Sequence, residues 1–180
     1  KHAESFTRRA IDADRDAVIA RAIAAGVAQM VCIADTLEEA ERGIALAAAH
    51  PQIFATVGVH PHHAKTWTAE SKEKMTALIG ASKKVVAVGE IGLDYHYNNS
   101  PPDAQKKAFR EQLMIAKELK MPSVVHCREA VEDVWAIVSD VQPPRLVLHC
   151  CTEKWDDVAR FVDRGDFLSF TGIATYKNAG

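Results

Sequence analysis

The chain has 180 residues, 48% of them hydrophobic and 26% charged, and a formal net charge of −2 at pH 7. This length predicts one domain over residues 1–180, and the charge argues against a protein whose whole surface coats nucleic acid, while leaving room for a local phosphate site. No run approaches the roughly 18 apolar residues of a membrane span, and the start KHAESFTRRA lacks the apolar core of a secretory signal, so we expect no membrane partner.

Short, continuously apolar runs alternate with helical patterns along the chain. A helix is predicted over 12–25, because apolar residues recur at helical spacing and Gly26 follows as a C-terminal signal. After a strand at 29–34, Thr36 to Glu39 resembles a capping box that opens a helix reaching His50. The remaining predicted elements are strands at 53–60, 85–90, 122–127, 145–150 and 167–170, with helices at 69–79, 103–119, 129–139 and 154–164 between them.

This alternation predicts an α/β protein. Strands without an apolar–polar alternation are typical of a parallel sheet covered on both faces, with helices outside it. Two architectures compete, an open doubly wound sheet and a (β/α)₈ barrel. No glycine-rich loop follows the first strand, and six units are too few to close an eight-stranded barrel. Either the sheet is open or the chain is part of a larger barrel.

The four cysteines, Cys32, Cys127, Cys150 and Cys151, include no C-x-x-C pair. All of them lie within or at the ends of apolar runs, which is typical of buried thiols in a reducing compartment. We therefore predict a cytoplasmic protein.

Potentially reactive side chains fall at the ends of four consecutive predicted strands: His60, Glu90, His126 and His149. In a parallel sheet these ends share one edge, where such folds carry their chemistry. A single histidine there is more often structural, but four residues in register indicate a site. Imidazole and carboxylate are common ligands of zinc and manganese. A serine nucleophile is the rival, but no G-x-S-x-G elbow is present, and Ser123 sits inside a strand.

Long motifs in this chain resemble one family, the TatD-like metal-dependent deoxyribonucleases. The stretch Gly89-Glu90-Ile91-Gly92-Leu93-Asp94-Tyr95 is similar to the family signature. The segments 57–62, 121–128, 148–152 and 170–179 are similar to further motifs of the family, in the same order. The resemblance runs from about Asp14 to Gly180. It implies a (β/α)₈ TIM-type barrel of the amidohydrolase class, with one or two divalent metal ions (Mg, Mn or Zn) at the strand ends.

The resemblance also assigns the metal and catalytic residues. Glu90 matches the carboxylate that bridges two metals, and His126 and His149 match ligands of one of them. Two histidines and one glutamate can hold one ion, so a two-metal centre needs further ligands. Asp94 is a candidate outer residue that supports the Glu90 loop.

Four other residues are expected to face the substrate. His60 and His62 lie on the loop that lines the substrate cleft in relatives. Arg128 and Lys177 are candidate phosphate contacts, an inference from their charge and position.

The chain departs from the family pattern at both ends. Relatives open with a strand ending in His-x-His and carry Glu-Thr-Asp near the eighth strand; nothing before Asp14 matches the first, and the chain ends at Gly180. We expect it to hold strands two to seven of a longer, working protein.

The predicted function is divalent-metal-dependent hydrolysis of phosphodiester bonds in DNA by a metal-activated water, as a TatD-like exonuclease. RNA is a possible second substrate, and no obligate protein partner is expected. Two alternatives stay open. One is a small-molecule amidohydrolase, lactonase or phosphotriesterase of the same barrel type, and the other is a non-catalytic fragment.

Overall fold

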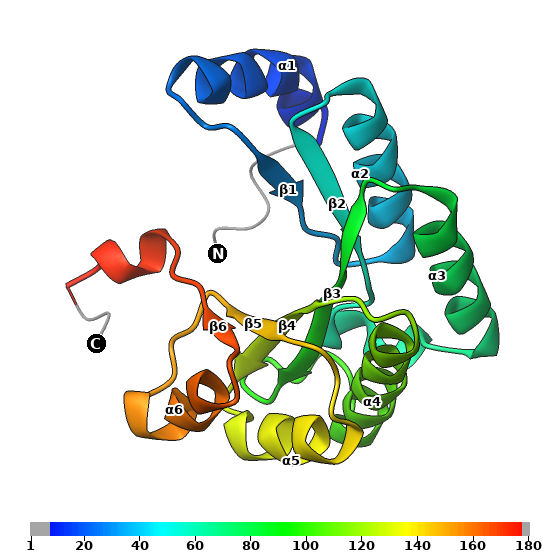
Figure 1. The fold of residues 1–180 in the computed structure, drawn as a ribbon, viewed down its shortest axis with the longest axis vertical. Coiled ribbons are helices and arrows are strands. Elements are labelled where there is room, and N and C mark those ends of the chain that lie inside the picture. The colour runs from blue at the N-terminus through cyan, green and yellow to red at the C-terminus, as the bar shows by residue number, and fades with distance from the viewer. Residues whose placement is uncertain (1–7, 178–180) are drawn as a thin grey trace. The chain divides into compact units, whose positions relative to one another are not determined.

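The structure, a computed structural model, describes the backbone of residues 8–177 and the side chains of residues 14–177 (Figure 1). Two compact units divide the chain, residues 1–30 and 31–180. The elements are, in order, α1 (Arg8–Ala24), β1 (Met30–Cys32), α2 (Leu37–Ala49), β2 (Ile53–Val57), η1 (Pro61–Thr66), α3 (Ala69–Ala81), β3 (Val85–Asp94), α4 (Pro102–Glu118), β4 (Ser123–Arg128), α5 (Val131–Val141), β5 (Leu146–His149), α6 (Trp155–Asp163), β6 (Phe167–Leu168) and η2 (Gly172–Thr175). All predicted helices and strands are confirmed, with ends shifted by a few residues, and the short helices η1 and η2 are additional.

The first unit is built on α1, which ends where the sequence predicts. Gly26 adopts a positive φ of 91°, which glycine reaches without the steric cost of a side chain. Around it the N–H of Gly26 donates to the carbonyl of Ile23, and that of Val27 donates to the carbonyl of Ala22. These bonds satisfy carbonyls at the end of the helix, as in a glycine C-cap.

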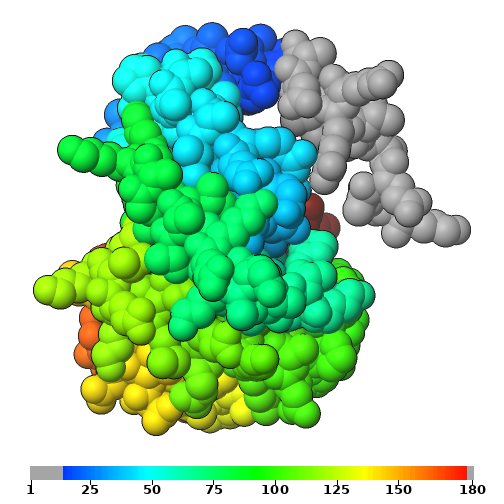
Figure 2. Space-filling view, turned by 90° about the vertical axis from the view of Figure 1, so that its right-hand side faces the viewer, coloured from blue at the N-terminus to red at the C-terminus, as the bar shows by residue number. Residues whose placement is uncertain are grey.

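The second unit is a sheet whose strands follow chain order from β1 to β6. Each pair from β2 to β6 is parallel. Figure 1 shows α2 to α6 on one side of this sheet, and Figure 2 faces that helical side. A doubly wound sheet would reverse its strand order and carry helices on both faces. Sequential order with one-sided helices is instead the pattern of a (β/α) barrel wall.

Strand β3 is longer than predicted, and the expectation that it ends at Glu90 is wrong. Its pairing with β4 shifts register between Val88 and Ile91 and then continues, with Gly92 opposite His126 and Asp94 at the strand's end. Gly92 permits this, because a Cβ at its position would lie only 2.0 Å from the carbonyl oxygen of His126. Glu90 therefore lies at the irregularity inside the strand, and Asp94 occupies the strand end.

Apolar side chains fill the space between the sheet and its helices. Phe109 and Leu113 of α4 are fully buried, and so are Ile91 and Leu93 of β3. Gln105 and Gln112 of the same helix are buried as well.

No helix in the described part of the chain is long and apolar enough to cross a membrane.

The predicted start of α2 is also confirmed. The Thr36 hydroxyl accepts a hydrogen bond from the N–H of Glu39 at 3.2 Å, as an N-cap does. The Glu39 carboxylate accepts from the N–H of Asp35. This fixes the turn between β1 and α2, which lies at the edge of the sheet where the predicted site residues gather.

Candidate metal centre

The structure brings Glu90, His126 and His149 together from three neighbouring strands. Glu90 is buried, and its two carboxylate oxygens face different histidines. Nδ1 of His149 lies 3.1 Å from Oε2, and Nδ1 of His126 lies 3.3 Å from Oε1. His126 and His149 are register partners on β4 and β5, which is why their rings reach the same carboxylate. One carboxylate thus lies between two imidazoles.

Asp94 organises the other side of His126. It is fully buried, and its Oδ2 accepts hydrogen bonds from Nε2 of His126 at 2.9 Å and from Nε2 of His62 at 3.1 Å. Asp94 is the predicted outer residue of the site, and among the described residues its carboxylate contacts these two rings and the N–H of Tyr97. Because Asp94 holds the Nε2 proton of His126, Nδ1 is left facing Glu90. Carboxylates orient metal-binding histidines in this way.

His60 completes the cluster. It follows β2 and caps η1, and its Nδ1 accepts a hydrogen bond from the N–H of His62 at 3.2 Å. The ring centre of His60 lies 4.5 Å from that of His126. His60, Glu90 and His126 each offer a ligand atom, and these atoms all lie within 4.8 Å of one another. Burial, followed by the charge of His126, lowers the pKa of His60 to about 3, so its ring is neutral.

The charges of the cluster balance within it. Burial raises the pKa of Glu90, but hydrogen bonds from His126 and His149 outweigh burial and bring it down to about 2. The hydrogen bond to Glu90 raises the pKa of His149. Burial lowers the pKa of His126, but its contacts with Glu90 and Asp94 outweigh burial, so that the pKa is raised above its ordinary value. Protons shared with histidines therefore stabilise the buried carboxylates.

This donor set fits a divalent cation. Imidazole nitrogens and carboxylate oxygens are ligands for zinc, manganese and magnesium, with magnesium favouring the oxygens. A cation bound among Glu90, His126 and His149 would take the place of the shared protons, and binding would release them. In this structure the buried Glu90 carboxylate is stabilised by the protons of two histidines. A site that needs positive charge next to a buried carboxylate favours a bound cation.

Asp35 is a site residue that the sequence interpretation missed. It follows β1, and its backbone carbonyl accepts a hydrogen bond from the N–H of His60 at 2.9 Å. Partial burial, followed by the charges of Glu39 and Glu90, raises the pKa of its carboxyl group. The rule that selected the other strand-end residues would also have selected Asp35, since it comes directly after the first predicted strand.

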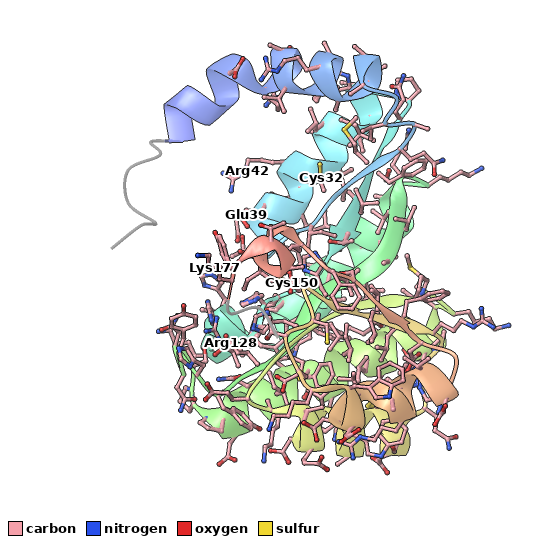
Figure 3. All side chains as sticks on the ribbon, turned by 90° about the vertical axis from the view of Figure 1, so that its left-hand side faces the viewer. Cys32, Glu39, Arg42, Arg128, Cys150 and Lys177 are labelled. Carbon is pink, nitrogen blue, oxygen red and sulfur yellow. The ribbon has the colours of Figure 1, made fainter. Side chains whose placement is uncertain are left out.

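The two predicted phosphate contacts differ in their surroundings. Arg128, the last residue of β4, has its guanidinium carbon 5.0 Å from the ring centre of Tyr97. Lys177 is exposed in the segment after η2, and within the described residues no contact joins it to the cluster. Figure 3 shows both side chains from the side of the molecule opposite to Figure 2.

Comparison with known proteins connects this geometry to a family. Residues 2–180 match the family model of TatD related DNases. The chain belongs to this family. The TatD relationship predicted from the motifs around Glu90 is thereby confirmed.

Named relatives agree with the TatD assignment. The chain is 42% identical to the 3'-5' ssDNA/RNA exonuclease TatD of Cronobacter sakazakii, over 98% of this chain and 67% of that protein. It is 41% identical to the protein of the same name from Enterobacter lignolyticus, over 93% and 65%. The chain therefore spans about two thirds of the length of these relatives.

Solved TatD structures share the fold. The crystal structure of YJJV, a TatD homolog from Escherichia coli K12, matches with a TM-score of 0.87 and 30% identity, over 93% of this chain and 66% of that one. A TatD family hydrolase from Entamoeba histolytica matches with a TM-score of 0.82 over 96% of this chain and 60% of that one; at 22% identity it bears on the fold alone.

Proposed function

We propose that the chain acts as a divalent-metal-dependent nuclease that removes nucleotides from single-stranded DNA or RNA by hydrolysing phosphodiester bonds. The observation that carries the proposal is the buried Glu90 carboxylate between His126 and His149, which suits a divalent cation. The exonuclease names of the TatD relatives support the substrate class. In this proposal, residues 1–180 are one metal-dependent hydrolase domain whose six strands correspond to strands two to seven of a (β/α)₈ barrel.

Glu90, His126 and His149 would hold one or two ions of magnesium, manganese or zinc. A divalent ion supplies Lewis-acid chemistry, since it acidifies water and withdraws charge from a phosphoryl oxygen. Glu90 sets the distance between the two histidines, because each of its oxygens faces one of them. Asp94 orients His126 by accepting its Nε2 proton, which points Nδ1 toward Glu90.

The remaining residues act on the substrate. His60 accepts a hydrogen bond at Nδ1, so its neutral ring carries the proton on Nε2 and can donate it to a phosphate oxygen. His62 is held by Asp94 beside it. Arg128 supplies a guanidinium suited to bidentate phosphate binding, and Lys177 supplies an ammonium group that can bind another phosphate of the nucleic-acid substrate.

We also infer a cytoplasmic setting with no obligate protein partner. Cys32, Cys127, Cys150 and Cys151 are free thiols, as expected in a reducing compartment. Burial raises the pKa of Cys32, Cys127 and Cys151, which keeps these thiols protonated and unreactive.

The proposal is tested with Glu90→Gln, His126→Ala, His149→Ala and Asp94→Asn. Calorimetric titration with Mn²⁺ and cleavage of a 5′-labelled single-stranded oligonucleotide are measured on each variant. We expect the first three to lose metal binding and at least 100-fold in rate, and Asp94→Asn to weaken metal affinity roughly 10- to 100-fold.

His50→Ala is the matched control, because His50 follows α2 at the opposite end of the strands. It should behave as the unaltered chain. Unchanged cleavage in all of Glu90→Gln, His126→Ala and His149→Ala would sink the assignment. Turnover of simple lactones or esters without cleavage of the oligonucleotide would favour the small-molecule hydrolase instead.

A further inference from the structure

An exposed tyrosine stands at the rim of the candidate metal centre. Tyr97 lies in the loop between β3 and α4, and 56% of its surface is exposed. Its N–H donates to Oδ1 of Asp94 at 2.8 Å, so the buried carboxylate that orients His62 and His126 also fixes the backbone of Tyr97. The ring centre lies 5.6 Å from that of His62, with the two planes at 87°. An apolar ring is thus anchored beside the cluster while remaining open to solvent.

The exposure of this ring is not explained by packing. Tyr95, two residues earlier, is half-buried, and its hydroxyl donates to Asp133 at 2.6 Å. Within the described residues, no such bond is recorded for the hydroxyl of Tyr97. Tyr97 instead leaves more than half of its surface open to solvent, as tyrosines at recognition surfaces do.

Arg128 sits on this ring with its charge available. Its guanidinium carbon lies 5.0 Å from the centre of the Tyr97 ring, a cation–π contact. Arg160 and Arg164 pair with Glu132 and Asp166. Within residues 14–177, no carboxylate pairs with Arg128. An unneutralised guanidinium held against an aromatic ring presents a phosphate contact and a stacking surface side by side.

We propose that Tyr97 and Arg128 form a nucleotide subsite next to the metal centre, in which a nucleobase stacks on Tyr97 and its phosphate binds Arg128. The inference rests on the proposed function, since it takes a nucleic acid as the substrate. It adds which residues bind one nucleotide of that substrate. Stacking on an aromatic ring accepts every base, because each base has a π-face. The subsite therefore suits a single-stranded substrate that is bound without sequence preference, with its bases unstacked.

The test compares two oligonucleotides on matched variants. One is an ordinary single-stranded DNA 10-mer, and the other lacks the bases of its two 3′-terminal nucleotides. For the ordinary 10-mer we expect Tyr97→Ala to raise KM roughly 5- to 100-fold, the range of one lost base–ring stack, with kcat within about twofold. For the abasic 10-mer the same substitution should leave KM unchanged. Tyr97→Phe keeps the ring and should restore the low KM.

Phe167→Ala is the control, because Phe167 is 57% exposed but begins β6, at the opposite end of the strands. It should leave KM unchanged for both oligonucleotides, while Arg128→Ala should raise KM for both. An equal loss on both oligonucleotides in Tyr97→Ala, or no loss on either, would overturn the subsite. Failure of the unaltered chain to cleave either oligonucleotide would instead overturn the proposed nuclease function.

Discussion

Replacing Gln112 with methionine should displace the backbone that positions His60 in the site. Gln112 is fully buried on α4, and its amide binds both polar groups of a single backbone residue. Its Oε1 accepts from the N–H of Val59 at 2.7 Å, and its Nε2 donates to the carbonyl of Val59 at 3.1 Å. Val59 lies beyond the end of β2 and directly precedes His60. The glutamine thus supplies the partners that a neighbouring strand would otherwise give.

The cost follows from those two hydrogen bonds. Methionine keeps the volume of glutamine but leaves a buried N–H and a buried carbonyl without partners, and each such group costs about 1–3 kcal/mol. We expect Gln112→Met to lower the free energy of unfolding by roughly 2–6 kcal/mol. For a chain of this length that is a fall in Tm on the order of 10 °C.

Calorimetric melting and oligonucleotide cleavage together separate positioning from plain stability. Leu113→Ala is the control: Leu113 is the next residue of α4 and fully buried, and its loss costs about 2–5 kcal/mol. At comparable loss of Tm, Gln112→Met should lower the cleavage rate at least tenfold, while Leu113→Ala should leave it within about twofold. Equal rates in the two variants, or a Tm shift below about 2 °C for Gln112→Met, would refute the reasoning.

Two further predictions concern stability. Because the pKa of His60 is lowered to about 3, the unfolded chain takes up a proton below pH 6.5 that the folded, metal-free chain does not; the free energy of unfolding should fall by about 2 kcal/mol between pH 7.5 and 5 on this account. His60→Gln should remove that part of the pH slope in urea unfolding with a chelator present, and identical slopes would contradict it. Lys84 donates from Nζ to the carbonyls of His50, Pro51 and Ile53, so Lys84→Met should cost about 1–3 kcal/mol in urea unfolding without changing Mn²⁺ affinity. The exposed neighbour Lys83, replaced in the same way, should cost little, and equal losses in the two variants would count against this role.

The convergence of Glu90, His126 and His149 could be predicted because it needs only the strands and their direction. Parallel strands bring their carboxyl ends to one edge, so a polar residue closing each apolar run must lie near the others. The same rule reaches Asp35, which follows the first strand. Sequential strand order and one-sided helices could not be predicted in this way, since alternating strands and helices fit both a barrel and a doubly wound sheet.

The sequence indicates Asp94 as an outer residue of the site, but its contacts with His62 and His126 could not be predicted, for a geometric reason. Strand β3 was expected to end at Glu90, whereas a register shift after Val88 and the close approach at Gly92 carry it on to Asp94. Only this extension places Asp94 level with Arg128 and against the rings of His62 and His126. A local irregularity of this kind depends on the partner strand, which the sequence around Glu90 does not contain.

The buried glutamines were missed for a related reason. Gln105 and Gln112 are seven residues apart on α4, so they lie on one face of the helix. Gln105 accepts from the N–H of Asp94 at 2.8 Å and donates to its carbonyl at 3.0 Å, as Gln112 does for Val59. Their partners are backbone groups of other segments, which leave no trace in side-chain patterns. A polar residue on the buried face of a helix indicates that its side chain must have a hydrogen-bond partner, but the sequence does not indicate which group that partner is.

His126 is the junction of the whole arrangement. Glu90 contacts His126 and His149, and Asp94 contacts His126 and His62, so among the residues whose side chains are described His126 alone pairs with both buried carboxylates. Loss of His149 leaves Glu90 with one imidazole and Asp94 with two, whereas loss of His126 leaves each carboxylate with one and separates the Glu90 pair from the Asp94 pair. Each partner that a buried carboxylate loses costs free energy, so His126→Ala, which takes one partner from both carboxylates, should destabilise the metal-free chain more than His149→Ala, which takes one from Glu90 alone. The opposite order in urea unfolding would mean that Asp94 does not depend on His126, and that the two carboxylates act as separate sites.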